Sequence, residues 1–355
     1  MKHWLKDISR IRGENFSRSN FLRLDKNERV INFPSNFLKL LKKKISSYHL
    51  SAYPDIEKIY KLLSRSLKIP KEMIVLTTGS DIAIKTCFEL FAERNKKIIT
   101  ITPTFGMIDV YSKLYNIKQI KIGYKKDFTL DTSKLLKSIN RNISLVIIAN
   151  PNSPTGTILE KKILITLIKK LNSLNIPILL DEAYFGFYKN TYIKYVKKYK
   201  NLIVVRTFSK VYGLAGIRMG YLVANTVIAQ NLYKFKPMYE ISSIGCLMLE
   251  LILKNKKILN DHIKEIRLGK EYFIKELDKL NIEHLKTYGN FIHINLGKKI
   301  IKFENLFKKK GILVRKGPGV KGYENFQRIT LGSRKQMKKV LVVIKSYFYN
   351  NKKII

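Results

Sequence analysis

The chain has 355 residues, more than a single hydrophobic core usually organises, so one large domain with a smaller one is expected. Its 45% of hydrophobic and 11% of aromatic residues exclude a largely disordered protein. The formal net charge of +43 could attract nucleic acid, but the surplus lysines are spread along the whole chain, which favours compositional bias over a basic binding motif.

The N-terminus, from Met1 to Asp7, lacks the apolar stretch of a signal peptide. No apolar run reaches the roughly 18–20 residues of a membrane helix. The two cysteines, Cys87 and Cys246, lie within apolar patterns and do not indicate a disulfide framework. We therefore expect a cytoplasmic protein without a membrane segment.

Strands and helices are predicted to alternate through the first two thirds of the chain. Apolar runs of strand length lie at 73–78, 97–101, 119–122, 145–149, 178–180 and 202–205, with helical patterns between them. Strands that are apolar on both faces are typical of a parallel sheet covered by helices on both sides. The sequence therefore predicts an α/β fold.

The last third of the chain has a different pattern. A long amphipathic region at 254–280 is followed by short predicted strands at 291–294, 312–314 and 328–330, which indicates an α+β domain. We expect an N-terminal arm that joins the small domain at 1–40, a large domain at 41–235 and the small C-terminal domain at 236–355.

Four polar segments follow directly on predicted strands of the large domain. They lie at 79–81, 150–156, 181–184 and 207–210. Ligands of such sheets bind beyond the carboxyl ends of the strands. The four segments are therefore expected to converge at one edge of the sheet and form a site there.

The segment from Arg206 to Tyr221 contains Ser209, Lys210, three glycines and Arg218. A lysine near glycines is, taken alone, most often part of a surface loop. The complete string, however, resembles the lysine loop of fold type I pyridoxal-phosphate enzymes in the class I/II aminotransferase family. The resemblance covers nearly the whole chain and is closest to the histidinol-phosphate aminotransferase-like branch. It implies a large domain with a mostly parallel sheet, a smaller α+β domain and pyridoxal 5′-phosphate as cofactor.

The resemblance assigns the chemistry to three residues. Lys210 would hold the cofactor as a Schiff base and must be deprotonated to do so, which the cationic neighbour Arg218 would favour while it binds the cofactor phosphate. Asp181 would face the pyridine nitrogen and keep it protonated, although a helix cap is an equally ordinary role for this aspartate. Tyr184 would hydrogen-bond the phenolic oxygen of the ring.

The family also implies a phosphate site at the start of a helix. Gly79, Ser80 and Asp81 would present backbone N–H groups and the positive end of the helix dipole to the phosphate, although the triplet is otherwise a common helix cap. Thr207 and Ser209, beside the lysine, are further candidates for binding the cofactor.

Two aromatic residues match further positions of the family. Phe105, within Pro103–Gly106, would stack on the pyridine face, or else belong to the core. Tyr53 matches a segment that reaches from one subunit to the phosphate in its neighbour's site. The resemblance therefore implies a homodimer with shared active sites.

The segment from Asn150 to Gly156 resembles the family's Asn-Pro-Thr-Gly turn but differs from it at one position. Ser153 stands where the family usually has the asparagine that bonds the ring oxygen. Either the hydroxyl of Ser153 or the amide of Asn152 would take that role.

Three residues are candidates for binding the substrates, a small amino donor and a keto acceptor. Arg328 resembles the arginine that grips a carboxylate or phosphate bidentately, and Arg315 is a second anion contact. Asn27 matches the substrate-facing N-terminal segment. The family's upstream tyrosine has no counterpart at 16–21, and residues 236–240 also depart from the histidinol-phosphate pattern.

Three functions are compatible with these residues. The preferred one is a transaminase acting on a small phosphorylated amino compound. A decarboxylase of phosphothreonine or phosphoserine would use the same residues, and a nucleic-acid-binding protein on an inactive scaffold is suggested only by the charge. Binding to nucleic acid or membrane is not expected, and neither is a metal site, because the five histidines lack metal-ligand spacing.

Overall fold

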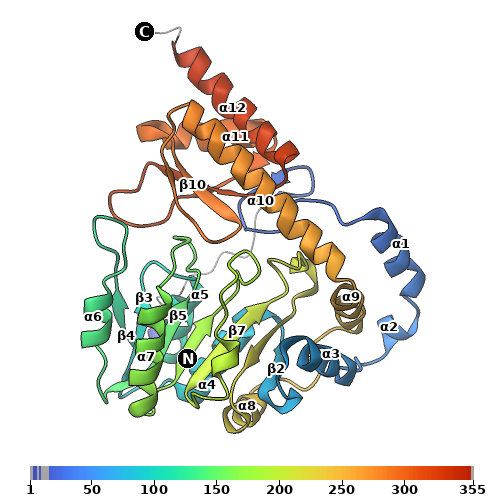
Figure 1. Cartoon of the computed structure of the whole chain (residues 1–355), viewed down its shortest axis with the longest axis vertical. Coiled ribbons are helices and arrows are strands. Elements are labelled where there is room, and N and C mark those ends of the chain that lie inside the picture. The colour runs from blue at the N-terminus through green and yellow to red at the C-terminus, as the bar shows by residue number, and fades with distance from the viewer. Residues whose placement is uncertain (1–2, 6–7, 9–15, 353–355) are drawn as a thin grey trace.

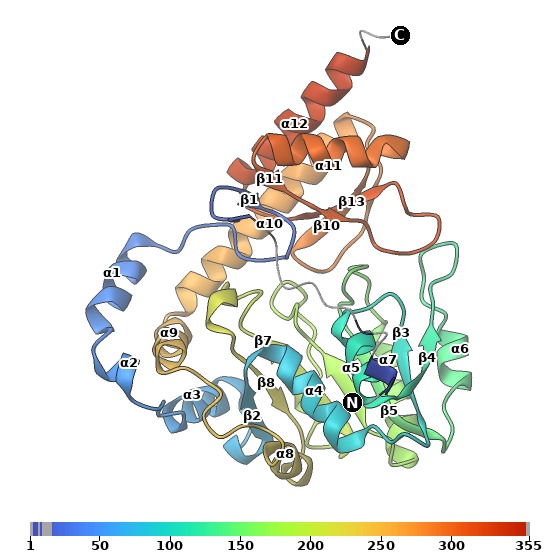
Figure 2. The same cartoon turned by 180° about the vertical axis from the view of Figure 1, so that it is seen from behind.

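The structure is a computed structural model and describes residues 3–5, 8 and 16–352. A large domain is built around a seven-stranded sheet, and a smaller domain with a four-stranded sheet lies above it in Figure 1. The chain ends in helix α12 (Arg334–Lys352), which projects from the small domain (Figure 2). Within the described residues, no helix is long and apolar enough to cross a membrane.

The large sheet has the strand order β2-β8-β7-β6-β5-β3-β4. Its strands are β2 (Ile74–Thr77), β3 (Lys97–Ile101), β4 (Lys118–Ile122), β5 (Ile143–Ala149), β6 (Ile178–Asp181), β7 (Leu202–Thr207) and β8 (Gly220–Val223). All neighbours are parallel except β8, which is antiparallel to both β2 and β7. The predicted α/β fold with a mostly parallel sheet is thus confirmed.

The central strands are buried because helices cover both faces of the sheet. Successive side chains of a strand point to opposite faces, so Ile178 and Leu180 join one hydrophobic core and Leu179 joins the other. One face carries α4 (Gly79–Phe91), α5 (Met107–Tyr115) and α8 (Thr226–Tyr233), and the other carries α3 (Glu57–Leu67), α7 (Lys161–Ser173) and α9 (Ser243–Lys254). This two-sided burial explains the uniformly apolar strands of the sequence.

The small domain has a core of its own, around Phe273, Ile292 and Ile329. Its antiparallel sheet has the order β12-β13-β10-β9, formed by β12 (Arg315–Lys316), β13 (Phe326–Thr330), β10 (Phe291–Asn295) and β9 (His284–Leu285). Helices α10 (Lys256–Lys279) and α11 (Ile300–Lys309) pack with α12 on it. The N-terminal arm joins this domain, since β1 (Leu22–Arg23) pairs in parallel with β11 (Ile312–Leu313).

The change from one core to the other lies within α10. Ile258 belongs to a core of the large domain and Ile266 to that of the small domain. This division lies more than twenty residues after the predicted boundary at 235, because α9 packs against α3 through Leu249 and Ile252. The helix α10 therefore connects the two domains as one continuous rod (Figure 1).

The remaining elements are short helices distributed over the N-terminal segment and both domains, and Gly297–Lys299 contacts α11 of the small domain. They are α1 (Ser35–Lys44), α2 (Tyr48–Ser51), α6 (Thr132–Lys137) and the 3-10 helices His3–Leu5, Lys71–Met73, Ile193–Tyr195, Ala215–Ile217 and Gly297–Lys299. Helices α1 and α2 carry exposed apolar side chains, among them Leu38, Tyr48 and Leu50.

Candidate active site

A cavity of about 1040 Å³ lies beyond the carboxyl ends of the parallel strands, where the arm and the small domain face the large domain. Thirteen of the residues singled out from the sequence line it: Asn27, Ser80, Asp81, Phe105, Ser153, Asp181, Tyr184, Thr207, Ser209, Lys210, Arg218, Arg315 and Arg328. The structure therefore brings together all four strand-end segments at one place.

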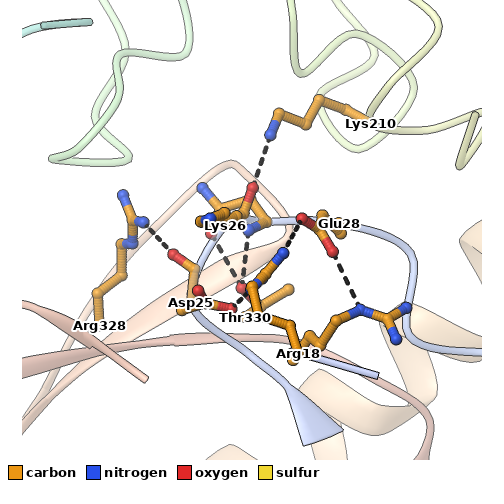
Figure 3. A network of polar contacts seen from close by, with 9 residues as sticks. Arg18, Asp25, Lys26, Glu28, Lys210, Arg328 and Thr330 are labelled. Atoms are coloured by element: carbon orange, nitrogen blue, oxygen red, sulfur yellow. Dashed lines mark hydrogen bonds and ion pairs between the residues drawn. The ribbon is translucent and has the colours of Figure 1, made fainter. Parts of the chain in front are cut away.

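Lys210 projects from the end of β7 toward the N-terminal arm. The turn after it is closed by a hydrogen bond from Gly213 N to Lys210 O (3.0 Å), and Gly213 has a positive φ of +73°, which favours glycine. The Nζ atom donates a hydrogen bond to the backbone oxygen of Lys26 at 2.9 Å (Figure 3). The lysine amine thus crosses the cavity between the two domains.

Asp181 is the last residue of β6 and is buried, with 7% of the residue exposed. Burial raises the pKa of the Asp181 carboxyl to about 7, and the neighbouring charge of Glu182 acts in the same direction. A hydrogen bond from Ala183 N (2.9 Å) and the charge of Lys210 oppose this rise. No α-helix begins here, so the helix-cap alternative is wrong.

A phosphate-sized group would find several donors at the start of α4. Arg218 reaches this point, and a Cβ atom on Gly79 would lie only 3.0 Å from its Nη2 atom. The hydroxyl of Ser209 lies 3.4 Å from Nη1 of the same arginine. A Cβ on Gly220 would lie 2.6 Å from the backbone nitrogen of Ser80, so glycine is required for this close approach.

Two members of the predicted phosphate site have structural partners. The carboxylate of Asp81 accepts a hydrogen bond from the Tyr111 hydroxyl at 2.7 Å and so ties α4 to α5. The hydroxyl of Thr207 accepts a hydrogen bond from the backbone of Ser209 at 3.1 Å. Both interactions fix the turns that present the other donors.

Asn152 and Ser153 take different directions in their loop. The Asn152 amide is buried and donates to Pro103 O (2.8 Å) and the Tyr124 hydroxyl (3.0 Å), while its oxygen accepts from Thr104 (2.8 Å). Ser153 lines the cavity and Asn152 does not. Of the two alternatives left open by the sequence, Ser153 is the one that reaches the cavity.

Tyr184 and Phe105 form aromatic walls of the cavity. The Tyr184 hydroxyl accepts a hydrogen bond from Nδ2 of Asn27 at 2.7 Å, and its ring meets Phe291 edge-on at a centroid distance of 5.4 Å. Phe105 precedes α5 and packs against the core of that face of the sheet. Its side chain therefore serves both core and cavity.

Arg328 and Arg315 face each other across β12 and β13 in register. Arg328 is only 9% exposed, and its Nη2 atom donates to the backbone oxygen of Asp25 at 2.6 Å (Figure 3). Burial and the positive charge of Arg315 lower the pKa of Arg328. Arg315 is exposed on the same side of the cavity.

The sequence did not point to the network that holds the arm in place. Arg18 forms ion pairs with Asp25 (2.6 Å) and Glu28 (2.9 Å), as Figure 3 shows. Arg23 contacts Glu28 at 3.1 Å. These residues match no known motif. The only indication of the network in the sequence is the mixture of positive and negative charges between residues 18 and 28.

A second missed feature lies behind Asp181. Arg206 and Glu182 form a buried ion pair at 2.8 Å, to which the Thr191 hydroxyl is also bound. The guanidinium lies 3.4 Å from the centroid of the Phe185 ring. Glu182 directly follows Asp181, and Arg206 lies in β7, shortly before Lys210. The pair therefore links the two chain segments that carry Asp181 and Lys210.

Tyr53 is a predicted site residue that lies outside this arrangement. Its side chain is exposed and stacks on Tyr239 at a centroid distance of 4.0 Å. It does not line the cavity of its own chain. In the described part of the chain, no group of three or more His, Cys, Asp or Glu side chains is suited to a metal ion.

The donor groups fit the cofactor that the resemblance implies. Pyridoxal 5′-phosphate needs an amine for its aldehyde, a carboxyl for its pyridine nitrogen, a partner for its phenolic oxygen and donors for its phosphate. Lys210, Asp181 and Tyr184 line the cavity and would supply the first three, and Arg218 and Ser80 would supply the last. Among the described residues the buried Asp181 has no ion-pair partner, which suits a cationic ring nitrogen.

Comparison with known proteins agrees with this arrangement. The sequence profile of the family described as Aminotransferase class I and II matches residues 17–344. The histidinol-phosphate aminotransferase of Clostridium novyi (strain NT) is 31% identical over 342 residues, which cover 94% of this chain and 93% of the relative. Histidinol-phosphate aminotransferase 1 of Carboxydothermus hydrogenoformans is 33% identical over 323 residues, with 90% and 91% covered.

The fold also matches solved structures. The crystal structure of the histidinol-phosphate aminotransferase of Sinorhizobium meliloti in complex with pyridoxal-5′-phosphate has a TM-score of 0.86 at 22% identity, and 98% of each chain is covered. The family profile spans nearly the whole chain, and relatives more than 30% identical cover about nine tenths of it. The chain therefore belongs to the class I and II aminotransferases and is a pyridoxal-phosphate-dependent transaminase.

Proposed function

We propose that this transaminase takes the amino group from histidinol phosphate or a closely similar small phosphorylated amine. The observation that carries the proposal is Arg328, a buried guanidinium that lines the cavity and has no carboxylate partner among the described residues. A buried cation is costly unless an anion binds it. Arg315, beside it in register, adds a second positive charge. The names of the relatives point to the same substrate.

The residues around the cavity would divide the work as follows. When bound, the cofactor supplies an electron-withdrawing ring that stabilises the negative charge left at the substrate Cα. Lys210 Nζ would hold the cofactor covalently, and once displaced by the substrate amine it would accept the Cα proton. Asp181 would hold the proton on the ring nitrogen. Arg218 and the start of α4 would bind the cofactor phosphate.

We also propose that two copies of the chain form a cytoplasmic homodimer with shared sites. Exposed apolar side chains gather on α1, α2 and the segments beside Tyr53 and Tyr239: Leu38, Leu40, Ile45, Tyr48, Leu50, Tyr233, Phe235 and Met238. A surface of this kind is suited to contact with another protein. The exposed Tyr53 would then serve the phosphate site of the partner subunit.

A substrate comparison tests the proposal against the decarboxylase alternative. The purified, cofactor-loaded enzyme is mixed with histidinol phosphate, histidinol, phosphothreonine or phosphoserine, each with and without a keto acid. We expect loss of the cofactor's visible absorption with histidinol phosphate and its recovery with the keto acid. Release of carbon dioxide from a phosphorylated amino acid, without a need for keto acid, would instead establish decarboxylation.

A matched pair of arginine variants tests the role of Arg328. Arg328→Ala should lower kcat/KM for the phosphorylated amine roughly 30- to several-thousand-fold, because it removes a desolvated charge-assisted contact. Arg267→Ala removes an exposed arginine of α10, 64% of whose side chain is accessible, and should leave kcat/KM unchanged. Equal effects of the two substitutions would contradict the assignment.

A further inference from the structure

We propose that Asn27 is a positioning residue that fixes the direction of the Tyr184 hydroxyl, and so makes Tyr184 a hydrogen-bond donor toward the cavity. This role differs from the direct substrate contact predicted from the sequence. The inference rests on the proposed placement of the cofactor's phenolic oxygen beside Tyr184. It makes Thr330, which no motif singled out, the residue that orients Asn27.

The contacts of Asn27 define this role. The side chain is buried, with 2% of the residue exposed, and its Nδ2 atom lies 2.7 Å from the Tyr184 hydroxyl. Its backbone nitrogen donates to Oγ1 of Thr330 at 3.0 Å, and the same Oγ1 lies 3.1 Å from its Oδ1. Asn27 lies on the arm. Its side chain and backbone N–H bind Thr330 of the small domain, and its side chain also binds Tyr184 of the large domain.

The polarity of this chain of hydrogen bonds follows from the donors that each group has. The backbone N–H of Asn27 donates a hydrogen bond to Thr330 Oγ1. The Thr330 hydroxyl is then free to donate its own hydrogen bond to Oδ1 of Asn27. The Nδ2 end of the amide then faces Tyr184. An amide nitrogen only donates, so the Tyr184 oxygen accepts there, and its own proton must point to another acceptor.

The backbone shows that the position of Asn27 is built for this contact. Asn27 has a φ of +56°, in the left-handed region that asparagine and glycine adopt most readily. Its backbone oxygen accepts a hydrogen bond from Asn290 at 3.2 Å, and Thr330 N donates to Leu24 O at 2.9 Å. The arm is thus held at Leu24 and at Asn27 itself, which keeps Nδ2 directed at Tyr184.

The direction of the Tyr184 proton has a chemical consequence. A hydrogen bond donated to the phenolic oxygen of the cofactor favours the anionic oxygen, and so lowers the pKa of the chromophore linked to Lys210. If Tyr184 instead donated to residue 27, the ring oxygen would lose that stabilisation. The pH titration of the visible absorption therefore reports the direction of this one proton.

Substitutions at 27 and 330 separate direction from mere shape. Asn27→Asp keeps the shape of the side chain but places a carboxylate beside Tyr184. This carboxylate accepts a hydrogen bond from the Tyr184 hydroxyl, whose O–H bond then points away from the cavity. Asn27→Gly tolerates the positive φ and removes the amide, so Tyr184 is left free to rotate. Thr330→Val removes the hydroxyl that orients the amide, and Thr330→Ser restores it as the conservative control.

The experiment is a pH titration of the visible absorption of the cofactor-loaded variants. Asn27→Asp should raise the chromophore pKa by about 1 unit or more, a tenfold change in the ionisation equilibrium, and Asn27→Gly and Thr330→Val should raise it less. Thr330→Ser should match the unsubstituted enzyme. Tyr184→Phe should raise the pKa as well, and adding Asn27→Gly to it should change nothing further.

The outcomes distinguish this inference from the proposed function. If no chromophore forms on Lys210 in the unsubstituted chain, the assigned cofactor site is wrong. If the chromophore forms and Asn27→Asp and Thr330→Val leave its pKa unchanged, only the positioning role is overturned. The role is also overturned if Asn27→Gly shifts the pKa as much in the Tyr184→Phe background as in the unsubstituted enzyme, because the shift would then not pass through Tyr184.

Discussion

Replacement of Asp181 by asparagine should stabilise the cofactor-free protein at alkaline pH, although it impairs the loaded enzyme. Asparagine keeps the shape of the side chain and can still accept the hydrogen bond from Ala183 N. The substitution removes an ionisable carboxyl. Burial raises the pKa of this carboxyl to about 7. The substitution therefore tests whether Asp181 is held ready for a cationic partner.

The sign and size of the effect follow from proton linkage. The folded-state pKa lies above the ordinary value of an aspartate, so the folded protein loses stability as pH rises between these two values. Asparagine does not ionise and escapes this loss. Between pH 5 and the folded-state pKa of about 7 the gap between variant and parent widens by about 1.4 kcal/mol per pH unit, so it grows by roughly 3 kcal/mol from pH 5 to pH 8.

Thermal unfolding of the cofactor-free proteins measures this gap. With an unfolding entropy of about 2.1 cal/mol/K per residue, roughly 3 kcal/mol corresponds to a difference in Tm of about 4 °C for a chain of this length. Asp261→Asn, which alters a side chain on α10 that is 54% exposed, is the matched control and should show no such widening. A gap between Asp181→Asn and its parent that is constant with pH would refute the argument.

Addition of the cofactor should reverse the order. The ring nitrogen, once protonated, would give Asp181 a cationic hydrogen-bond partner in addition to the bond from Ala183 N, so the parent should gain more Tm at pH 8 than the variant. The variant should still bind the cofactor through its phosphate but lose most turnover, because nothing then holds the proton on the ring. Near-normal turnover would show that Asp181 has no part in the chemistry.

Three further outcomes are expected. Borohydride should fix the chromophore on Lys210, and Lys210→Ala should abolish both the chromophore and turnover; a reduced adduct mapped to another lysine would contradict the assignment. Arg315→Ala should weaken substrates with a distal phosphate and spare those without one, with cofactor affinity unchanged, as steady-state kinetics and cofactor titration will show. Mixing Tyr53→Phe and Lys210→Ala subunits should restore activity above that of either parent, and no restoration would argue against shared sites.

The fold could be predicted because its determinants are local and repetitive. The central strands β5, β6 and β7 are buried on both faces, so their sequences are mainly apolar, and the polar segments stand at the ends of strands. The placement of Asp181 and Lys210 at one sheet edge follows from the parallel arrangement alone. The domain boundary did not follow in the same way, because α9 is apolar along most of its length and could have packed against either core.

The details of the site depended on contacts that a linear pattern does not contain. Whether Asn152 or Ser153 faces the cavity is decided by Thr104 and Tyr124, which lie 48 and 28 residues away along the chain and use up the Asn152 amide. The role of Asn27 depends on Thr330, at a separation of 303 residues. The roles of such side chains can be assigned only when their hydrogen-bond partners in the folded chain are known.

The arm between residues 25 and 28 shows why these distant contacts belong to the chemistry. Lys210, from the large domain, binds the backbone oxygen of Lys26, while Arg328, from the small domain, binds that of Asp25 (Figure 3). The cofactor lysine and the proposed substrate arginine are therefore tethered to adjacent residues of one short segment. If Lys210 binds the cofactor covalently, its tether to Lys26 must break or rearrange, whereas Arg328 keeps further N–H groups, among them the unpaired Nε, for a substrate anion. The ion pairs of Arg18 with Asp25 and Glu28 then remain to hold the arm over the cavity.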